Sequence, residues 1–336
     1  MTETASSAGT APHTFGIVLV PGFSQFAFAS AVEPLRAAND ARGDSLYDWH
    51  VLSPDGAPVP ASSGVRVACD ASLSDVGALD TALVVSGKAG AEHQDSRTLA
   101  WLRERARRGA RIGAVSTGTY VLAQAGLLQD YRCTIHWKHL GAFAEMYPEI
   151  DVSGELYEID RNRLTCAGGE AAFDMMLALI GIEHGRELAV EVAENFMHER
   201  IRESADSQRM ALRTRLGLVH PKLLNVVELM EQHLEEPLSQ AELARQADLS
   251  TRQLERLFRQ HLNRTPNSYY QKLRLQAARS LLNQTSMSVT EVALACGFVS
   301  ASHFSKCYRR TFGRTPRQDR GPFNGAMSPA QVEAAT

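Results

Sequence analysis

The sequence lacks long apolar runs, a secretory leader and an ordered set of cysteines. No stretch reaches the roughly 18 consecutive apolar residues that a membrane-spanning helix needs. The first residues have neither the basic start nor the apolar centre of a signal peptide. The five cysteines are odd in number and scattered, which disfavours a disulfide framework. These absences predict a cytoplasmic protein with reduced thiols and no membrane association.

The sequence also lacks a complete set of metal ligands. Cys133, His136 and His139 lie close together in the chain. Structural zinc requires a second ligand pair at matching spacing, however, and none follows. We therefore predict no metal and no cofactor.

Charge is divided unevenly along the 336 residues, a length that allows two domains. Residues 219–320 contain 15 Lys and Arg against 9 Asp and Glu, a net charge of +6. The rest of the chain contains 20 against 29, a net charge of −9. Neutralising phosphates supplies much of a protein's affinity for DNA, so the basic part is the candidate DNA-binding module.

Two matching segments lie in the basic part, and we call residues 239–266 the first head and residues 288–316 the second head. They align at an offset of 49 residues at first and of 50 from Leu254 and Phe304 onward, so one extra residue enters the second head. Both begin with Ser followed three residues later by Glu, a capping box that marks a helix start. The two pairs are Ser239 with Glu242 and Ser288 with Glu291. Each head therefore predicts a helix-turn-helix.

The second helix predicted in each head has one apolar and one polar face. The polar face combines cationic and hydrogen-bonding side chains, which can contact base edges in the major groove and flanking phosphates. The candidate DNA-binding residues are Arg252, Glu255, Arg256 and Arg259 in the first head and Ser302, His303, Lys306 and Arg309 in the second. The alternative is an ordinary solvated surface, because helix-turn-helix is also a packing motif. The presence of two matching segments favours the DNA-binding interpretation of these faces.

Residues 295–298, 300–306 and 312–316 resemble the signature of the AraC/XylS regulators. The resemblance implies a seven-helix module that opens with residues 221–234 and joins its two heads by a long helix over residues 267–283. Two such heads would enter successive major grooves about 34 Å apart. Residues 318–320, Gln-Asp-Arg, depart from the family pattern, which usually has an aromatic residue before the final Arg. Because of this departure, the family pattern does not predict how the last helix packs.

The first two hundred residues alternate apolar strands with amphipathic helices, a pattern typical of a parallel sheet covered by helices. The predicted strands are residues 15–20, 49–53, 83–86, 111–115, 156–159 and 164–166. The predicted helices are one that ends near residue 38 and those over residues 97–107, 120–125 and 173–182. We therefore expect an α/β domain followed by an all-α domain.

Residues 114–119 join a strand to a helix in the manner of a nucleophile elbow. This part of the chain, about residues 14–199, resembles the class I glutamine amidotransferase-like fold, including its intracellular-protease (PfpI-type) branch. That family has Cys at the elbow where this chain has Ser116, and Glu33 and His136 match its other site positions. A serine needs a well-placed base, and Ala114 replaces the Gly of G-x-S-x-G. We favour a non-catalytic ligand pocket; the alternative is a Ser-dependent hydrolase or amidase.

Residues 33–39 and 166–169 extend the resemblance to regulators that fuse this fold to an AraC-type module, and most of all to regulators of carnitine, glycine betaine and arginine catabolism. The resemblance implies a cationic effector, which aromatic faces and carboxylates would hold. The candidate ligand-binding residues are Glu33, Phe23, Trp49, Ser116, Tyr120, His136 and Trp137. For each aromatic residue, ordinary core packing is the alternative.

The predicted organisation has five parts. They are a disordered tail over residues 1–13, a sensor domain over 14–200, a linker over 201–218, a DNA-binding domain over 219–320 and a second tail over 321–336. The expected partners are operator DNA, a small-molecule effector, a second copy of the chain in a homodimer, and RNA polymerase. The family resemblance favours activation over repression.

Overall fold

The computed structural model describes residues 11–87, 90–209, 212–217 and 220–320. The chain divides into two compact units, Met1–Gln208 and Arg209–Thr336, which we call the α/β unit and the helical unit. Most of the predicted first tail and all of the second lie outside the described residues, although His13 already begins a strand.

The α/β unit contains the predicted strands and helices, with ends that differ by a few residues. Its strands are β1 (His13–Leu19), β2 (Tyr47–Ser53), β3 (Val59–Pro60), β4 (Arg66–Val67), β5 (Ala71–Ser72), β6 (Thr81–Val85), β7 (Arg111–Val115), β8 (Cys133–Thr134), β9 (Val152–Ser153), β10 (Tyr157–Asp160) and β11 (Arg163–Cys166). Its helices are α1 (Gln25–Arg42), α2 (Ser96–Arg107), α3 (Gly118–Gln124), α4 (Leu140–Met146), α5 (Glu170–His184) and α6 (Arg186–Asn195).

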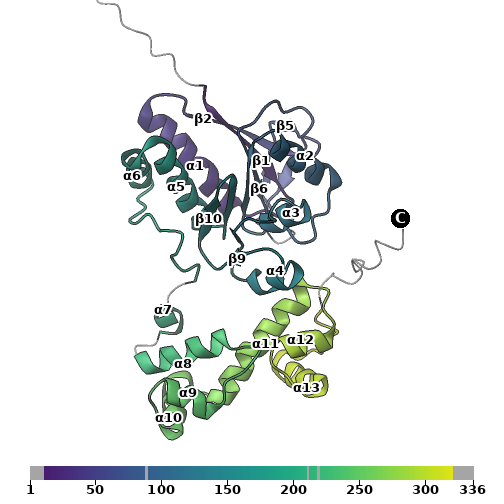
Figure 1. The fold of residues 1–336 in the computed structure, drawn as a ribbon, viewed down its shortest axis with the longest axis vertical. Helices are drawn as coiled ribbons and strands as arrows, with labels where there is room; N and C mark the ends of the chain where they lie inside the picture. The colour runs from purple at the N-terminus through teal and green to yellow at the C-terminus, as the bar shows by residue number, and fades with distance from the viewer. Residues whose placement is uncertain (1–10, 88–89, 210–211, 218–219, 321–336) are drawn as a thin grey trace, which may run out of the picture. The chain divides into compact units, whose positions relative to one another are not determined.

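The main sheet of this unit has the order β10-β11-β7-β6-β1-β2-β5. All neighbours are parallel except β10 and β11, which form an antiparallel pair at one edge. Helices α1, α5 and α6 pack together on one face, and α2 and α3 cover the other (Figure 1). Both faces are therefore covered, and every residue of the central strand β6 is buried.

The elbow follows strand β7, as predicted. Ser116 adopts a left-handed backbone conformation, with φ of 62°, and its N–H donates to the Cys166 carbonyl at 2.9 Å. Gly168 approaches Ser116 so closely that a Cβ on Gly168 would lie 2.5 Å from the Ser116 Cβ. Only glycine fits there, so the turn after β11 packs its backbone directly against Ser116.

The end of the α/β unit is a segment without helix or strand, residues 198–208, which we call the docking segment. The Leu156 N–H donates to the Ser204 carbonyl at 2.8 Å. The Gln208 amide donates to the carbonyls of Ile135 and Glu155 at 3.0 and 2.7 Å. Residues 201–208 of the predicted linker are thus hydrogen-bonded to the α/β unit.

The helical unit contains α7 (Leu212–Leu216), α8 (Pro221–Gln232), α9 (Gln240–Gln246), α10 (Thr251–Leu262), α11 (Pro266–Gln284), α12 (Val289–Ala295) and α13 (Ala301–Phe312). Helices α9 and α10 form the first head and α12 and α13 the second, and the long α11 contacts both (Figure 1). Both capping boxes are present at the predicted helix starts. A third, formed by Ser250 and Gln253, begins α10 and was not predicted.

The seven-helix expectation for this module was wrong in its last element. From residue 220 to residue 320, all of which are described, the structure has six helices, α8 to α13. Residues 315–318 form a turn, closed by hydrogen bonds to Thr315, in place of a final helix. The Asp319 carboxylate accepts from the Tyr308 hydroxyl at 2.8 Å and pairs with Arg279 at 2.9 Å. The Asp319 carboxylate therefore holds this end of the unit by polar contacts.

Candidate nucleic-acid interface and ligand cavities

The first head presents its predicted polar face to solvent. Arg252, Glu255, Arg256 and Arg259 are exposed on α10, while Leu254, Leu257 and Phe258 are buried on the opposite side. Helix α10 is strongly amphipathic for this reason. The Glu255 carboxylate accepts a hydrogen bond from Gln240 at 3.1 Å, at the start of α9. The three arginines are thus the cationic part of this face.

The second head is built in the same way. Ser302, His303, Lys306 and Arg309 are exposed on α13, above a buried row that includes Phe304 and Tyr308. Ser300 caps the helix by accepting from the His303 N–H at 3.3 Å. Each head therefore carries one exposed helix with cationic and hydrogen-bonding side chains, a shape and chemistry that fit the major groove.

A first cavity of the α/β unit, of about 270 Å³, lies beside the elbow, and we call it the elbow cavity. It is lined by Phe26, His136, Trp137, Leu156, Ala167, Gly168, Glu170, Ala171, Arg202 and Gln208. Two predicted ligand residues, His136 and Trp137, are on its wall. The Lys138 ammonium lies 5.3 Å from the centre of the Trp137 ring, so that ring already faces a cation.

The elbow does not assemble a catalytic triad. Among the described residues, Ser116 and His136 make no hydrogen bond to each other, and Glu33 pairs with Arg36 at 2.8 Å. The Lys138 backbone N–H donates to His136 Nδ1 at 3.2 Å. Burial lowers the pKa of the His136 imidazole, which favours its neutral form. With Nδ1 accepting this bond, Nε2 carries the proton in this arrangement.

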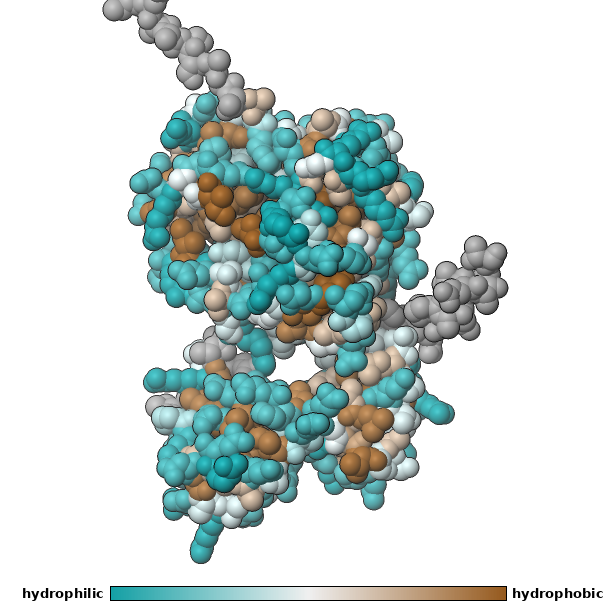
Figure 2. Space-filling model, in the orientation of Figure 1, coloured by the Kyte–Doolittle hydropathy of each residue, from teal (hydrophilic) through white to brown (hydrophobic). Residues whose placement is uncertain are grey.

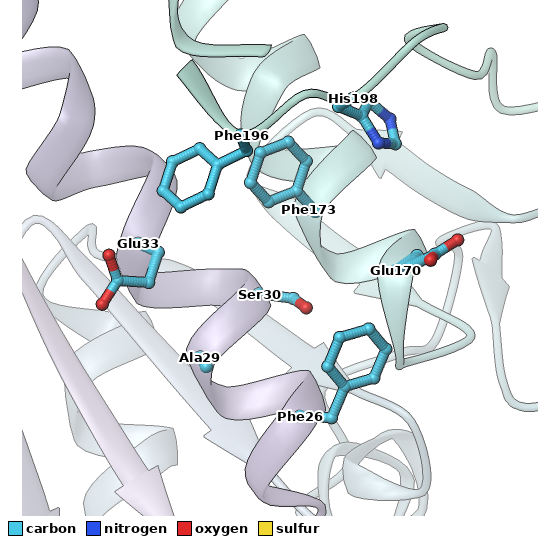
Figure 3. Close-up of a pocket in the computed structure, with 8 residues that line it drawn as sticks. All are labelled: Phe26, Ala29, Ser30, Glu33, Glu170, Phe173, Phe196 and His198. Carbon is cyan, nitrogen blue, oxygen red and sulfur yellow. The ribbon is translucent and has the colours of Figure 1, made fainter. Parts of the chain in front are cut away.

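A second cavity, of about 240 Å³, lies between α1 and α5, and we call it the aromatic cavity (Figure 3). It is lined by Phe26, Ala29, Ser30, Glu33, Glu170, Phe173, Phe196 and His198. Figure 3 shows Phe26 from α1 facing Phe173 and Phe196 across Ser30, with Glu33 and Glu170 at opposite sides. The Phe173 and Phe196 rings pack edge to face, 5.1 Å apart. Three phenylalanine rings thus surround one small space, and Glu33 and Glu170 lie at its two sides.

The other predicted ligand residues line neither cavity. Phe23 and Tyr120 are fully buried in the core, where Tyr120 packs against Phe143 and His139. Trp49 packs against the main core of the unit, and Ser116 is buried beside Gly168. Phe23, Trp49 and Tyr120 thus make the contacts of ordinary core packing, and their role as ligand residues stays a prediction.

Several cavity residues were missed from the sequence. Phe26, Ala29 and Ser30 lie on one helical face with the predicted Glu33, so this wall was present as a pattern. Phe26 is 59% exposed, which is unusual for so large an apolar side chain. Phe196 and His198 carry no such signal, because only the tertiary fold brings them to α1.

One buried carboxylate connects the two cavities. Asp174 on α5 is fully buried and accepts from Arg202 through the backbone N–H at 2.9 Å, Nε at 2.9 Å and Nη2 at 2.6 Å. It also hydrogen-bonds His198 Nε2 at 3.0 Å. His198 lines the aromatic cavity and Arg202 the elbow cavity. Asp174 therefore fastens the docking segment at both walls.

In the described part of the chain, no group of three or more His, Cys, Asp or Glu side chains is placed to hold a metal ion. No described helix combines the length and apolar character needed to cross a membrane.

Two capped helix-turn-helix heads with exposed basic helices, joined to an α/β unit with ligand-sized cavities, define a DNA-binding regulator of two parts. Residues 243–321 match the helix-turn-helix domain family and residues 16–181 match the DJ-1/PfpI family. The chain is 50% identical to the HTH-type transcriptional regulator GbdR of Pseudomonas aeruginosa over 310 residues, 92% of this chain and 84% of GbdR. It is 48% identical to the regulator CdhR of the same species over 322 residues, 96% of this chain and 94% of CdhR.

A solved structure is similar over about half of the chain. The crystal structure of an AraC family transcriptional regulator from Pseudomonas putida superposes with a TM-score of 0.51 and 28% identity, covering 55% of this chain and all of that one. The chain belongs to the AraC-type transcriptional regulators with an N-terminal DJ-1/PfpI domain. It is a DNA-binding transcription regulator.

Proposed function

We propose that the regulator activates transcription in response to a small cationic metabolite, which the α/β unit binds without turning it over. The observation that carries this proposal is the aromatic cavity, with its three phenylalanine rings and two carboxylates. A cation over an aromatic face is attracted by the ring quadrupole, and more strongly where water is excluded. The size of the cavity suits a small metabolite rather than a peptide.

The proposal also covers how ligand binding affects DNA binding. The exposed faces of α10 and α13 contact operator DNA, and ligand binding favours the DNA-competent arrangement of the chain, which requires differential affinity for two states. A homodimer and contact with RNA polymerase belong to the same proposal and are supported only by family membership.

A thermal-shift screen tests the ligand class. Among betaines, carnitine, arginine and their breakdown products, a binder at about 100 times its Kd stabilises the folded chain by about 2.7 kcal/mol. In a unit of this size that corresponds to a rise of roughly 5–11 °C in Tm. If only metabolites without a cationic group raise the Tm, the cationic ligand is ruled out.

A matched pair of variants tests the cavity. Arg36 pairs with both Glu33 and Asp40, at 2.8 and 2.6 Å, but only Glu33 lines the aromatic cavity. Glu33→Gln is expected to weaken binding of the cationic ligand about tenfold, or about 1.4 kcal/mol, whereas Asp40→Asn leaves the titration unchanged. Equal affinities in the two variants would place the ligand outside this cavity.

The absence of turnover is tested at the elbow. Because a serine needs a well-placed base and no hydrogen bond joins Ser116 to His136 in the described part of the chain, the purified chain is expected to hydrolyse a panel of amides and esters no faster than the Ser116→Ala variant. A robust turnover that Ser116→Ala abolishes would show that the α/β unit is an enzyme.

A further inference from the structure

The turn of the second head contains one residue more than that of the first, and the structure identifies it. Four residues separate α9 from α10, and five separate α12 from α13. Asp248 and Gly297 both have positive φ, 52° and 71°, and so occupy equivalent places. Ser250 and Ser300 are the equivalent N-caps. The added residue therefore lies between Phe298 and Ser300, and it is Val299.

Val299 has no packing role in its own head. In the first head the residue before the N-cap, Leu249, packs against the core near Leu254, in the manner of a hydrophobic staple. In the second head Phe298 takes this part, with its ring 5.2 Å from that of Phe304. Val299 is left 96% exposed.

The turn that carries Val299 is held firmly. Arg274 on α11 donates to the carbonyls of Cys296 and Gly297 at 2.7 and 2.5 Å, and its guanidinium lies 4.1 Å from the centre of the Phe298 ring. A Cβ on Gly297 would lie 2.6 Å from the Glu235 carbonyl, so glycine is required there. The exposure of Val299 thus belongs to a fixed turn.

The surroundings of Val299 indicate what covers it. It precedes Ser300, the N-cap of the helix that exposes Ser302, His303 and Lys306. The N-terminal residues of a recognition helix are those that contact base edges. Figure 2 shows brown, apolar surface on the second head. The exposed large apolar residues of this head, among those described, are Leu294 on α12 and Val299 in the turn before α13. Among base edges in the major groove, only the thymine methyl group is an apolar partner.

We infer that Val299 contacts a thymine C5-methyl group in the half-site of the second head and makes that head prefer thymine at one position. The first head has no counterpart, so the two heads differ in specificity. This inference rests on the proposal that α13 enters the major groove. It adds one residue to the DNA interface that neither the repeat nor the polar faces indicated.

Uracil replacement tests the contact without changing the protein. The operator is selected from a random pool by the full-length chain, and the half-site of the second head is identified by the positions where Lys306→Ala relaxes selectivity. Replacing one thymine there by uracil, which lacks the methyl group, is expected to weaken binding threefold to fourfold, about the effect of burying one methyl group. Uracil at the other thymines has less effect.

The variant Val299→Ser completes a double-mutant cycle between this side chain and the thymine methyl group. It is expected to bind the thymine operator about as weakly as the wild type binds the uracil operator, and to lose nothing further with uracil. Leu294→Ser is the matched control, because Leu294 is another exposed apolar residue of the second head but lies on α12. It is expected to keep the wild-type uracil response.

Three results would overturn the inference. They are a selected half-site without thymine, a uracil scan in which wild type and Val299→Ser respond alike, and a Val299→Ser protein that binds normally but fails to activate polymerase. If both Val299→Ser and Lys306→Ala bind the operator like the wild type, the proposed role of α13 fails together with the Val299 contact. If Lys306→Ala weakens binding and Val299→Ser does not, the Val299 contact is refuted while the proposed role of α13 stands.

Discussion

Replacing Arg202 by methionine is expected to destabilise the α/β unit by about 3–5 kcal/mol, because it leaves the buried Asp174 carboxylate without its charged partner. Asp174 is 0% exposed and receives three of its hydrogen bonds from Arg202, two of them from the guanidinium. Methionine replaces the apolar stem of the arginine side chain with one of similar length and removes the charged guanidinium group. In a unit of about 200 residues the Tm is expected to fall by roughly 6–20 °C, as measured by calorimetry of the full chain.

Two further variants separate this effect from a general loss of surface charge. Asp206→Asn removes the partner of the exposed Arg200 in the same segment and is expected to leave the Tm nearly unchanged. Asp174→Asn combined with Arg202→Met removes both charges and is expected to recover much of the loss. A Tm for Arg202→Met equal to that of the wild type would show that the docking segment is not fastened in this way.

Arg256→Ala and Lys306→Ala are each expected to weaken operator binding, one through the first head and the other through the second. If each side chain contacts a base edge, the loss is about 1–3 kcal/mol, or roughly 5-fold to 150-fold in Kd. Both residues are exposed on the helices whose opposite faces are buried, so the substitutions leave packing intact. Fluorescence anisotropy with a selected operator at fixed salt measures the change.

The control for this pair removes a cation from the other unit. Arg97 is exposed at the start of α2, and Arg97→Ala changes the net charge equally. It is expected to bind the operator like the wild type. The slope of affinity against salt then distinguishes a phosphate contact, whose removal lowers the slope by about one, from a base contact. Wild-type affinity in both Arg256→Ala and Lys306→Ala would refute the proposed faces.

The helical unit was predictable because its signals are local. The Ser and Glu of a capping box are three residues apart, and the buried residues of α10 recur at helical spacing, so short windows contain the information. The extra residue in the second head was also visible as a change of offset. Its identity was not, because assigning it to Val299 needs the positive φ of Asp248 and Gly297.

The ligand cavities were less predictable because their walls come from distant parts of the chain. Glu33 was selected as a carboxylate in need of a partner, and the structure supplies Arg36, one helical turn away. Phe196 and His198 reach α1 only through the packing of α5 and α6. The elbow itself was predicted correctly. The hydrogen bond from Lys138 that occupies His136 depends on a loop geometry that residue spacing does not define.

The central claim is that occupancy of the α/β unit controls the DNA-binding heads. The most direct test is the Kd of the full-length chain for its selected operator, with and without a saturating concentration of the metabolite found by thermal shift. The account predicts that the metabolite tightens operator binding by roughly 5-fold to 150-fold, and that operator DNA tightens metabolite binding by the same factor. A metabolite that stabilises the α/β unit and leaves the operator Kd unchanged would contradict the account.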